Sequence, residues 1–200
     1  MRARDNPFAS RRIEGLSYRF LDGSWEELLA RFAALGGRGA LVGPEGSGKT
    51  TLLEQLAARL TAAGREVGLV GAEPERGPRR DRLQRLLRAA GPSTLLLVDG
   101  ADALAAGEWR SLARETRALG GLVVTAHREG LLPTLHRTTT SAALLAELAT
   151  SLAGEHSGPP EDWEALHRRH GGDVRAALRA LYDSAATDRL LRRDGVSGAG

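Results

Sequence analysis

Residues 43–50, Gly-Pro-Glu-Gly-Ser-Gly-Lys-Thr, combine a flexible backbone, one cation and two hydroxyls within a short segment. Glycines allow such a turn to direct successive backbone N–H groups inward, where they can donate to phosphate oxygens. A helix that begins at the end of the turn adds the positive end of its dipole. We therefore expect a phosphate-binding loop formed by Gly43, Pro44, Glu45, Gly46, Ser47, Gly48, Lys49, Thr50 and Thr51.

The lysine and the first threonine of this loop have separate expected roles. The segment matches the pattern G-x-x-x-x-G-K-[ST], in which the lysine reaches the β- and γ-phosphates and the hydroxyl ligates Mg²⁺. Lys49 is the only lysine among the 28 lysine and arginine residues. Because the chain uses arginine everywhere else, a compact and flexible ammonium at this position favours a site for a nucleoside triphosphate and Mg²⁺.

A carboxylate follows an apolar run, STLLLVD at 93–99. Asp99 ends this run 50 residues after Lys49, the separation expected when a helix, a strand and a second helix intervene. A P-loop site needs a carboxylate at the end of a neighbouring strand to hold the magnesium shell. We therefore expect Thr50 and Asp99 to be the metal ligands.

The residue after Asp99 is Gly100, where most additional-strand ATPases have a glutamate that polarises the attacking water. Two other carboxylates could replace that glutamate. Asp102 lies within reach if the turn folds back, and Glu45 lies in the phosphate-binding loop itself. We favour Asp102 as the catalytic base; the alternative is that Asp102 caps the helix that follows.

Apolar runs alternate with helical patterns along the chain, which is typical of a mostly parallel α/β sheet. Strands are expected at 40–42, 66–70, 93–99, 121–126 and around 134–139. Helices are expected at 25–36, 50–63, 83–91, 106–119, 142–153, 161–170 and 173–185. The sequence therefore predicts a P-loop NTPase fold, with a mostly parallel five-stranded sheet flanked by helices and a small C-terminal helical lid.

This order of elements predicts four segments. Residues 1–37 are expected to form an N-terminal arm and a helix capped by Ser24, and residues 38–140 the nucleotide-binding α/β core. Residues 141–190 are expected to form the helical lid, followed by a disordered tail at 191–200.

The composition limits the cellular environments and the kinds of binding partner that we expect for this protein. At 200 residues and 42% hydrophobic, the chain can bury one sizeable core and a small appendage, and without cysteine it can form neither disulfides nor thiolate metal sites. Neither a signal peptide nor a run of about 18 apolar residues is evident, so we expect a cytoplasmic protein without a membrane span. An arginine-rich stretch at 75–88 lacks aromatic residues, so nucleic-acid binding stays open but unsupported.

The order of these motifs resembles bacterial P-loop ATPases of the AAA+ and signal-transduction (NACHT-like) branch. VDGAD is similar to the Asp-Gly-x-Asp-Glu acidic motif of NACHT-type ATPases. The resemblance implies that Asp99 is the magnesium residue and Asp102 the distal acid, whereas Ala103 departs from the expected glutamate. The pattern also resembles uncharacterised bacterial ATP-binding proteins, so it implies no substrate beyond the nucleotide.

Two further segments carry this resemblance. VVTAHR resembles the fourth strand of the branch, which implies that Thr125 senses the γ-phosphate, with His127 and Arg128 just past it. GGDVRAALRALYD is similar to the AAA+ lid, which implies that Arg175 reaches back to the nucleotide; a solvated helix arginine is the alternative. The N-terminal residues Asn6, Phe8 and Ile13 either lie near the adenine or anchor an apolar arm.

Three functions remain after two classes are excluded. The chain has one asparagine and one lysine, so it cannot contain the Asn-Lys-x-Asp motif of GTPases, and it lacks the Leu-Ser-Gly-Gly signature of ABC ATPases. We predict a slow or partner-stimulated ATPase that acts as a switch or assembly factor, with a protein partner or a second copy of itself. Alternatives are a non-hydrolysing ATP-binding module and a small P-loop kinase. The expected catalytic residues are Lys49, Asp102, Thr125 and Arg175.

Overall fold

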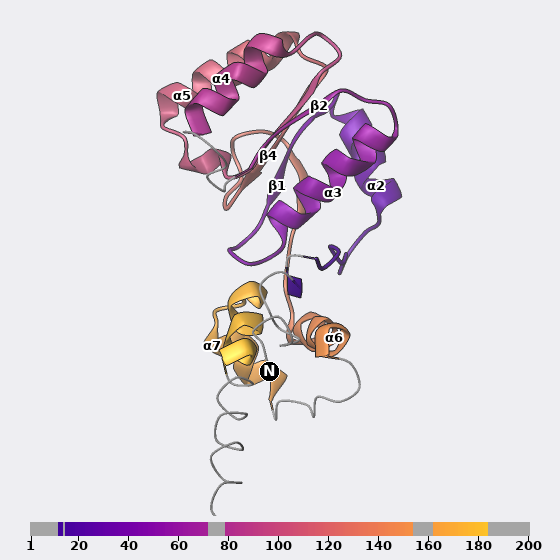
Figure 1. Ribbon diagram of the computed structural model, residues 1–200, viewed down its shortest axis with the longest axis vertical. Coiled ribbons are helices and arrows are strands. Elements are labelled where there is room, and N and C mark those ends of the chain that lie inside the picture. The colour runs from indigo at the N-terminus through magenta and orange to yellow at the C-terminus, as the bar shows by residue number, and fades with distance from the viewer. Residues whose placement is uncertain (1–11, 14, 72–78, 154–161, 184–200) are drawn as a thin grey trace, which may run out of the picture. The chain divides into compact units, whose positions relative to one another are not determined.

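The structure is a computed structural model that describes residues 12–13, 15–71, 79–153 and 162–183 (Figure 1). The chain divides into two compact units. One unit, the core, comprises residues 20–44 and 48–139, and the other comprises residues 1–19, 45–47 and 140–200. The predicted division into four segments stays a prediction, and its tail at 191–200 lies outside the described residues.

The core contains a five-stranded sheet with the order β2-β3-β4-β1-β5. Every neighbouring pair of strands is parallel, which confirms the predicted architecture and its fifth strand. The strands are β1 (Arg38–Val42), β2 (Val67–Val70), β3 (Leu95–Val98), β4 (Gly121–Ala126) and β5 (Thr134–Arg137).

The central strands are apolar because helices cover both faces of the sheet. All residues of β3 and β4 are buried, as are four of the five in β1. The carboxyl ends of parallel strands meet at one edge of the sheet, where ligands bind in open α/β folds. The residues that follow β1, β3 and β4 at this edge are Gly43, Asp99 and His127.

Four α-helices accompany the sheet, and they lie on its two sides (Figure 1). On one side, leucines of α4 and α5 pack against alternate residues of β1, β3 and β4. On the other side lie α2 and α3, and the predicted leucine stripe of α3 is buried. These helices are α2 (Trp25–Ala34), α3 (Lys49–Ala62), α4 (Arg79–Ala89) and α5 (Ala106–Glu115).

The boundaries of the elements differ from the predicted ones by a few residues. The hydroxyl of Ser24 accepts a hydrogen bond from the N–H of Glu27, which confirms the predicted cap of α2. The helix predicted at 106–119 ends earlier, at Glu115, and continues as a 3₁₀ turn, Thr116–Ala118. Within that turn the hydroxyl of the buried Thr116 donates to the carbonyl of Leu112. Such a bond competes with regular helix hydrogen bonding.

The described residues of the second unit are mainly helical, as the sequence predicts for its C-terminal part. The unit contains α6 (Ala142–Ala153), α7 (Trp163–Arg169) and a helix at 174–183. The side chain of Asp173 accepts from the N–H of Ala176 and caps the last of these helices. Ile13 is buried among the apolar residues of this unit, as an apolar anchor would be, whereas Asn6 and Phe8 lie outside the described residues. In the ranges that the structure describes, no helix has the length and apolarity to span a bilayer.

Candidate functional site

The turn after β1 has the backbone that a phosphate-binding loop requires. Gly46 and Gly48 have φ angles of 66° and 85°, a left-handed conformation that favours glycine. Gly48 is the N-cap of α3 and has no side chain that could bond to the first N–H groups of the helix. These donors, together with the positive end of the helix dipole, suit an anionic ligand.

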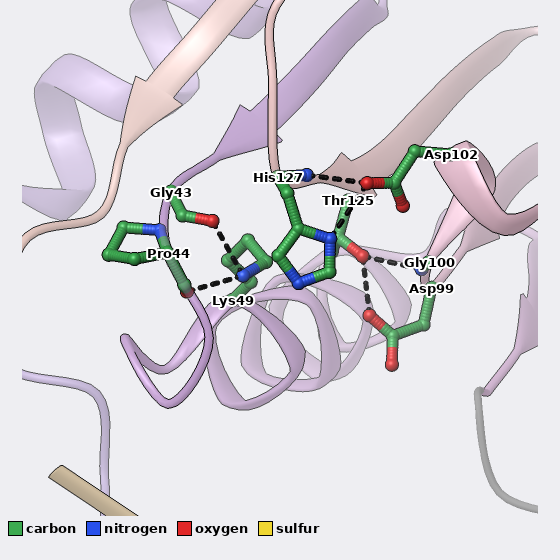
Figure 2. Close-up of polar contacts among 8 residues, drawn as sticks. All are labelled: Gly43, Pro44, Lys49, Asp99, Gly100, Asp102, Thr125 and His127. Atoms are coloured by element: carbon green, nitrogen blue, oxygen red, sulfur yellow. Dashed lines mark hydrogen bonds and ion pairs between the residues drawn. The ribbon is translucent and has the colours of Figure 1, made fainter. Parts of the chain in front are cut away.

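Lys49 lies against its own loop. Its ammonium nitrogen donates to the carbonyl oxygens of Gly43 at 2.7 Å and Pro44 at 2.6 Å (Figure 2). These contacts hold the cation at the first two residues of the loop, and its expected contact with the phosphates stays a prediction. The carbonyls are neutral acceptors, so phosphate oxygens would form stronger, charge-assisted bonds with the same ammonium.

Thr50 and Asp99 meet at the start of α3. The hydroxyl of Thr50 donates to Oδ2 of Asp99 at 2.9 Å, and Asp99 is only 4% exposed. A hydroxyl and a carboxylate are oxygen ligands of the kind that Mg²⁺ prefers. No group of three or more acidic, histidine or cysteine residues suitable for a metal occurs in the described ranges. The pair therefore fits a magnesium ion that takes its other ligands from phosphate and water.

Thr125 lies on β4, beside the end of β3. Its hydroxyl donates to Oδ1 of Asp99 at 2.5 Å and accepts the N–H of Gly100 at 2.6 Å (Figure 2). Thr50 and Thr125 thus each bond to a different oxygen of the Asp99 carboxylate. Thr125 positions the expected metal ligand, a role that the sequence does not reveal, and its expected contact with the γ-phosphate stays a prediction.

Gly100 occupies the position where many related ATPases have a glutamate, and its backbone conformation is one that favours glycine. Its φ angle is 61° and its ψ angle 48°, in the left-handed region. A residue with a side chain costs about 1–2 kcal/mol in this conformation. The backbone of the turn after Asp99 therefore favours glycine at position 100.

Asp102 lies in a 3₁₀ turn, Ala101–Ala103, and is bonded to His127. One carboxylate oxygen, Oδ2, accepts the main-chain N–H of His127 at 2.8 Å and lies 2.7 Å from Nδ1 of its ring (Figure 2). Burial raises the pKa of Asp102, whereas its interactions, chiefly with His127, together lower the pKa by more than burial raises it. The pKa therefore lies below its ordinary value. The alternative role of Asp102 as a helix cap is wrong, because α5 begins at Ala106 with Ala105 as its N-cap.

His127 is the polar residue at this edge to which the sequence assigns no role. The signal that could have identified it is its position directly after a buried strand, where catalytic and ligand-binding residues of open α/β sheets gather. Its partner Asp102 lies 25 residues earlier in the chain. The pairing depends on β3 and β4 being neighbours, which no local pattern encodes.

Three of the other predicted residues, Glu45, Ser47 and Arg175, belong to the second unit. Glu45 is exposed and Ser47 is buried. Arg175 is exposed on the helix at 174–183 of the same unit, so its role toward the nucleotide stays a prediction. The hydrogen bonds above instead connect Lys49 to the loop and Thr50 and Thr125 to Asp99.

No curated protein matches the chain significantly. Among solved structures, it is similar to RuvB of Thermotoga maritima, described as a Holliday junction branch migration motor, with 20% identity and a TM-score of 0.49. That similarity covers 78% of this chain and 60% of the RuvB chain. A mutant form of the same protein shows 21% identity and a TM-score of 0.48, over 76% of this chain and 56% of that one. The chain thus matches less than two thirds of the RuvB chain.

A sequence family covers the segment that carries the site. Residues 40–152, which are more than half of the chain, match the family described as "ATPase family associated with various cellular activities (AAA)". The matched segment contains the phosphate-binding loop, Asp99 and Thr125. The chain therefore belongs to the AAA family of ATPases.

Proposed function

We propose that this protein binds Mg·ATP and hydrolyses it slowly, and that a protein partner or self-association raises the rate. In this proposal the nucleotide state of the protein acts as a molecular switch or directs an assembly step. The observation that carries the proposal is the fixed Asp99 carboxylate, bonded to Thr50 and Thr125 beside the Lys49 loop. We also propose a cytoplasmic location and a place in the bacterial, NACHT-like branch.

Binding of the triphosphate would use groups that are already in place. The N–H groups of the loop and of the start of α3 donate to phosphate oxygens, and Lys49 exchanges its two carbonyl partners for phosphate. Thr50 and Asp99 hold the magnesium ion, which neutralises charge on the phosphates when it is bound. Adenine is the proposed base, because the chain cannot contain the guanine-reading motif.

Slow turnover follows from the residue after Asp99. A positioned general base contributes roughly 10²–10⁴-fold to the rate, and Gly100 has no side chain to act as one. An arginine supplied by a neighbouring subunit adds about 10³–10⁵-fold in related phosphoryl-transfer sites. Arg128 and Arg137 are both exposed, but Arg137 already pairs with Glu129 at 2.6 Å, and we assign neither as this finger.

A non-hydrolysing ATP-binding module is the second candidate. Its support is the state of Asp102, the carboxylate that the sequence favours as a base. Both bonds from His127 fall on one oxygen of this carboxylate and stabilise its charge, which lowers its basicity. If Asp102 is the only available base, hydrolysis would be negligible and ATP would serve to stabilise one conformation.

The rate of ADP formation distinguishes these candidates. We expect slow ADP formation by the purified protein, with a specific activity that rises with protein concentration or on addition of host extract. Lys49→Ala should abolish the activity, whereas Arg65→Ala, a change of an exposed arginine after α3, should leave it unchanged. A wild-type rate equal to that of Lys49→Ala under every condition would contradict the ATPase proposal and leave the binding module.

A further inference from the structure

His127 and Asp102 form a hydrogen-bonded pair at the edge of the sheet that carries the phosphate-binding loop. The carboxylate of Asp102 accepts from the main chain of His127 at 2.8 Å and lies 2.7 Å from its ring nitrogen Nδ1. The main-chain bond fixes where the residue sits, and the ring contact fixes how the imidazole is turned. The pair is therefore a built arrangement, with two bonds that restrict one side chain.

The same segment of chain contacts the start of the phosphate-binding loop. The carbonyl of Ala126, the residue before His127, accepts the N–H of Gly43 at 3.2 Å. The carbonyl of Gly43 in turn accepts from the ammonium of Lys49 at 2.7 Å. His127 is thus bonded directly to Ala126, whose carbonyl accepts from Gly43, and the carbonyl of Gly43 accepts from Lys49.

The bond to Asp102 also sets the proton on the ring. The pKa of Asp102 is lowered, so its carboxylate is ionised at neutral pH and can only accept a hydrogen bond. Nδ1 of a neutral His127 must therefore carry the proton, which leaves a lone pair on Nε2. The side chain of His127 is 54% exposed, and the second ring nitrogen is directed away from Asp102 (Figure 2). A carboxylate that orients an imidazole in this way is the arrangement of a general base.

We propose that His127, oriented by Asp102, accepts the proton of the attacking water during ATP hydrolysis. This inference rests on the proposed ATPase function and names a group that takes over part of the role of the missing glutamate, so turnover without a partner stays slow. The water oxygen forms a bond to the γ-phosphorus, the bond to the β–γ bridging oxygen breaks, and ADP leaves. The water proton passes to Nε2, and the imidazolium is stabilised by Asp102 until it releases that proton to solvent. Asp102 is a positioning residue in this scheme.

Single-turnover hydrolysis of Mg·ATP tests the assignment. We expect His127→Ala to lower the rate about 100-fold, within the range for loss of a general base. Added imidazole should restore part of the rate of this variant, because it supplies the missing base. Asp102→Asn should give an intermediate rate that imidazole does not raise, since the ring is still present. His170→Ala, which changes a histidine at the end of α7, is the matched control and should keep the wild-type rate.

A thermal shift with Mg·ATP, measured on the same samples, separates this inference from the proposed function. We expect His127→Ala to keep the wild-type shift, because the base does not bind the ground state. If that variant fails to fold, His127→Gln keeps a side-chain amide that can donate to Asp102 but cannot act as a base, and it should show the same loss of rate. A wild-type rate in either variant, or no rescue by imidazole, would overturn the assignment. The assignment of His127 is also overturned if the wild type binds Mg·ATP but forms no ADP. If the wild type does not bind Mg·ATP at all, the proposed ATPase function is itself contradicted.

Discussion

Thr125 fixes Asp99 from the neighbouring strand, because its hydroxyl donates to Oδ1 of that carboxylate at 2.5 Å and accepts the N–H of Gly100 at 2.6 Å. Thr125 is 1% exposed and Asp99 4%, so water cannot easily replace the bond between them. The hydroxyl of Thr50 bonds to the other oxygen, Oδ2. The carboxylate expected to bind magnesium is therefore held in place before any ligand arrives.

Replacing Thr125 by valine should destabilise the protein. The change keeps the shape of the side chain but leaves the Gly100 N–H and one bond of Asp99 unsatisfied, at a cost of about 1–3 kcal/mol. Thr125→Ser keeps the hydroxyl and should lose less. Urea unfolding of the two variants measures the difference. Equal stabilities for the valine and serine variants would show that the hydroxyl does not hold this turn together.

Asp99→Asn should make nucleotide binding insensitive to magnesium. The amide retains the shape of the carboxylate but has no charge for a divalent cation. We expect the wild type to show a larger thermal shift with Mg·ATP than with ATP and EDTA, and Asp99→Asn to show the same shift with both. A magnesium-dependent gain of normal size in the variant would remove Asp99 from the metal site.

Alanine at Gly100 and at Gly107 should have opposite effects on stability. Gly100 has a φ of 61°, where a side chain costs about 1–2 kcal/mol. Gly107 lies inside α5 with open space where a Cβ would stand, so alanine should stabilise by roughly 0.5–1 kcal/mol. Unfolding free energies of both variants check this. A stabilised Gly100→Ala would mean that the turn after Asp99 tolerates a side chain.

The Asp102–His127 pair should make the free energy of unfolding depend on pH in the acidic range. The pKa of Asp102 is lowered in the folded protein, so its contribution is fully present above the usual value of 3.8 and is lost as the pH falls through the folded pKa. Asp102→Asn cannot lose this contribution. We expect wild-type stability to fall more steeply than that of Asp102→Asn as the pH is lowered below about 4. Parallel curves from urea unfolding would contradict the lowered pKa.

Local patterns in the sequence are sufficient to predict the elements of this fold. The strand at 121–126 and the loop from Gly43 to Thr50 follow from apolar runs and turn residues, which act over a few positions. The ends of helices are predicted less precisely. Helix α3 begins at Lys49 instead of residue 50, and α5 ends at Glu115 instead of residue 119. These ends depend on backbone and side-chain bonds that compete within one turn.

The relationships between functional residues could not be predicted in the same way. Val98 pairs with Val124, so the residues that follow them, Asp99 and Thr125, are neighbours across the sheet. Ala126 pairs with Val42, which brings His127 beside the phosphate-binding loop. Both facts depend on strand order and register, which are set by packing of the whole sheet. The sequence therefore predicts Thr125 as a site residue but neither its bond to Asp99 nor the role of His127.

The measurement that tests the central claim most directly is the thermal shift of the purified protein with Mg·ATP. At about 100 times the dissociation constant, the nucleotide should add roughly 2.7 kcal/mol to the free energy of unfolding. Lys49→Ala should lose most of this gain, and Arg65→Ala should keep it. An equal shift in Lys49→Ala, or no shift in the wild type at millimolar Mg·ATP, would contradict the proposal that this loop binds the triphosphate.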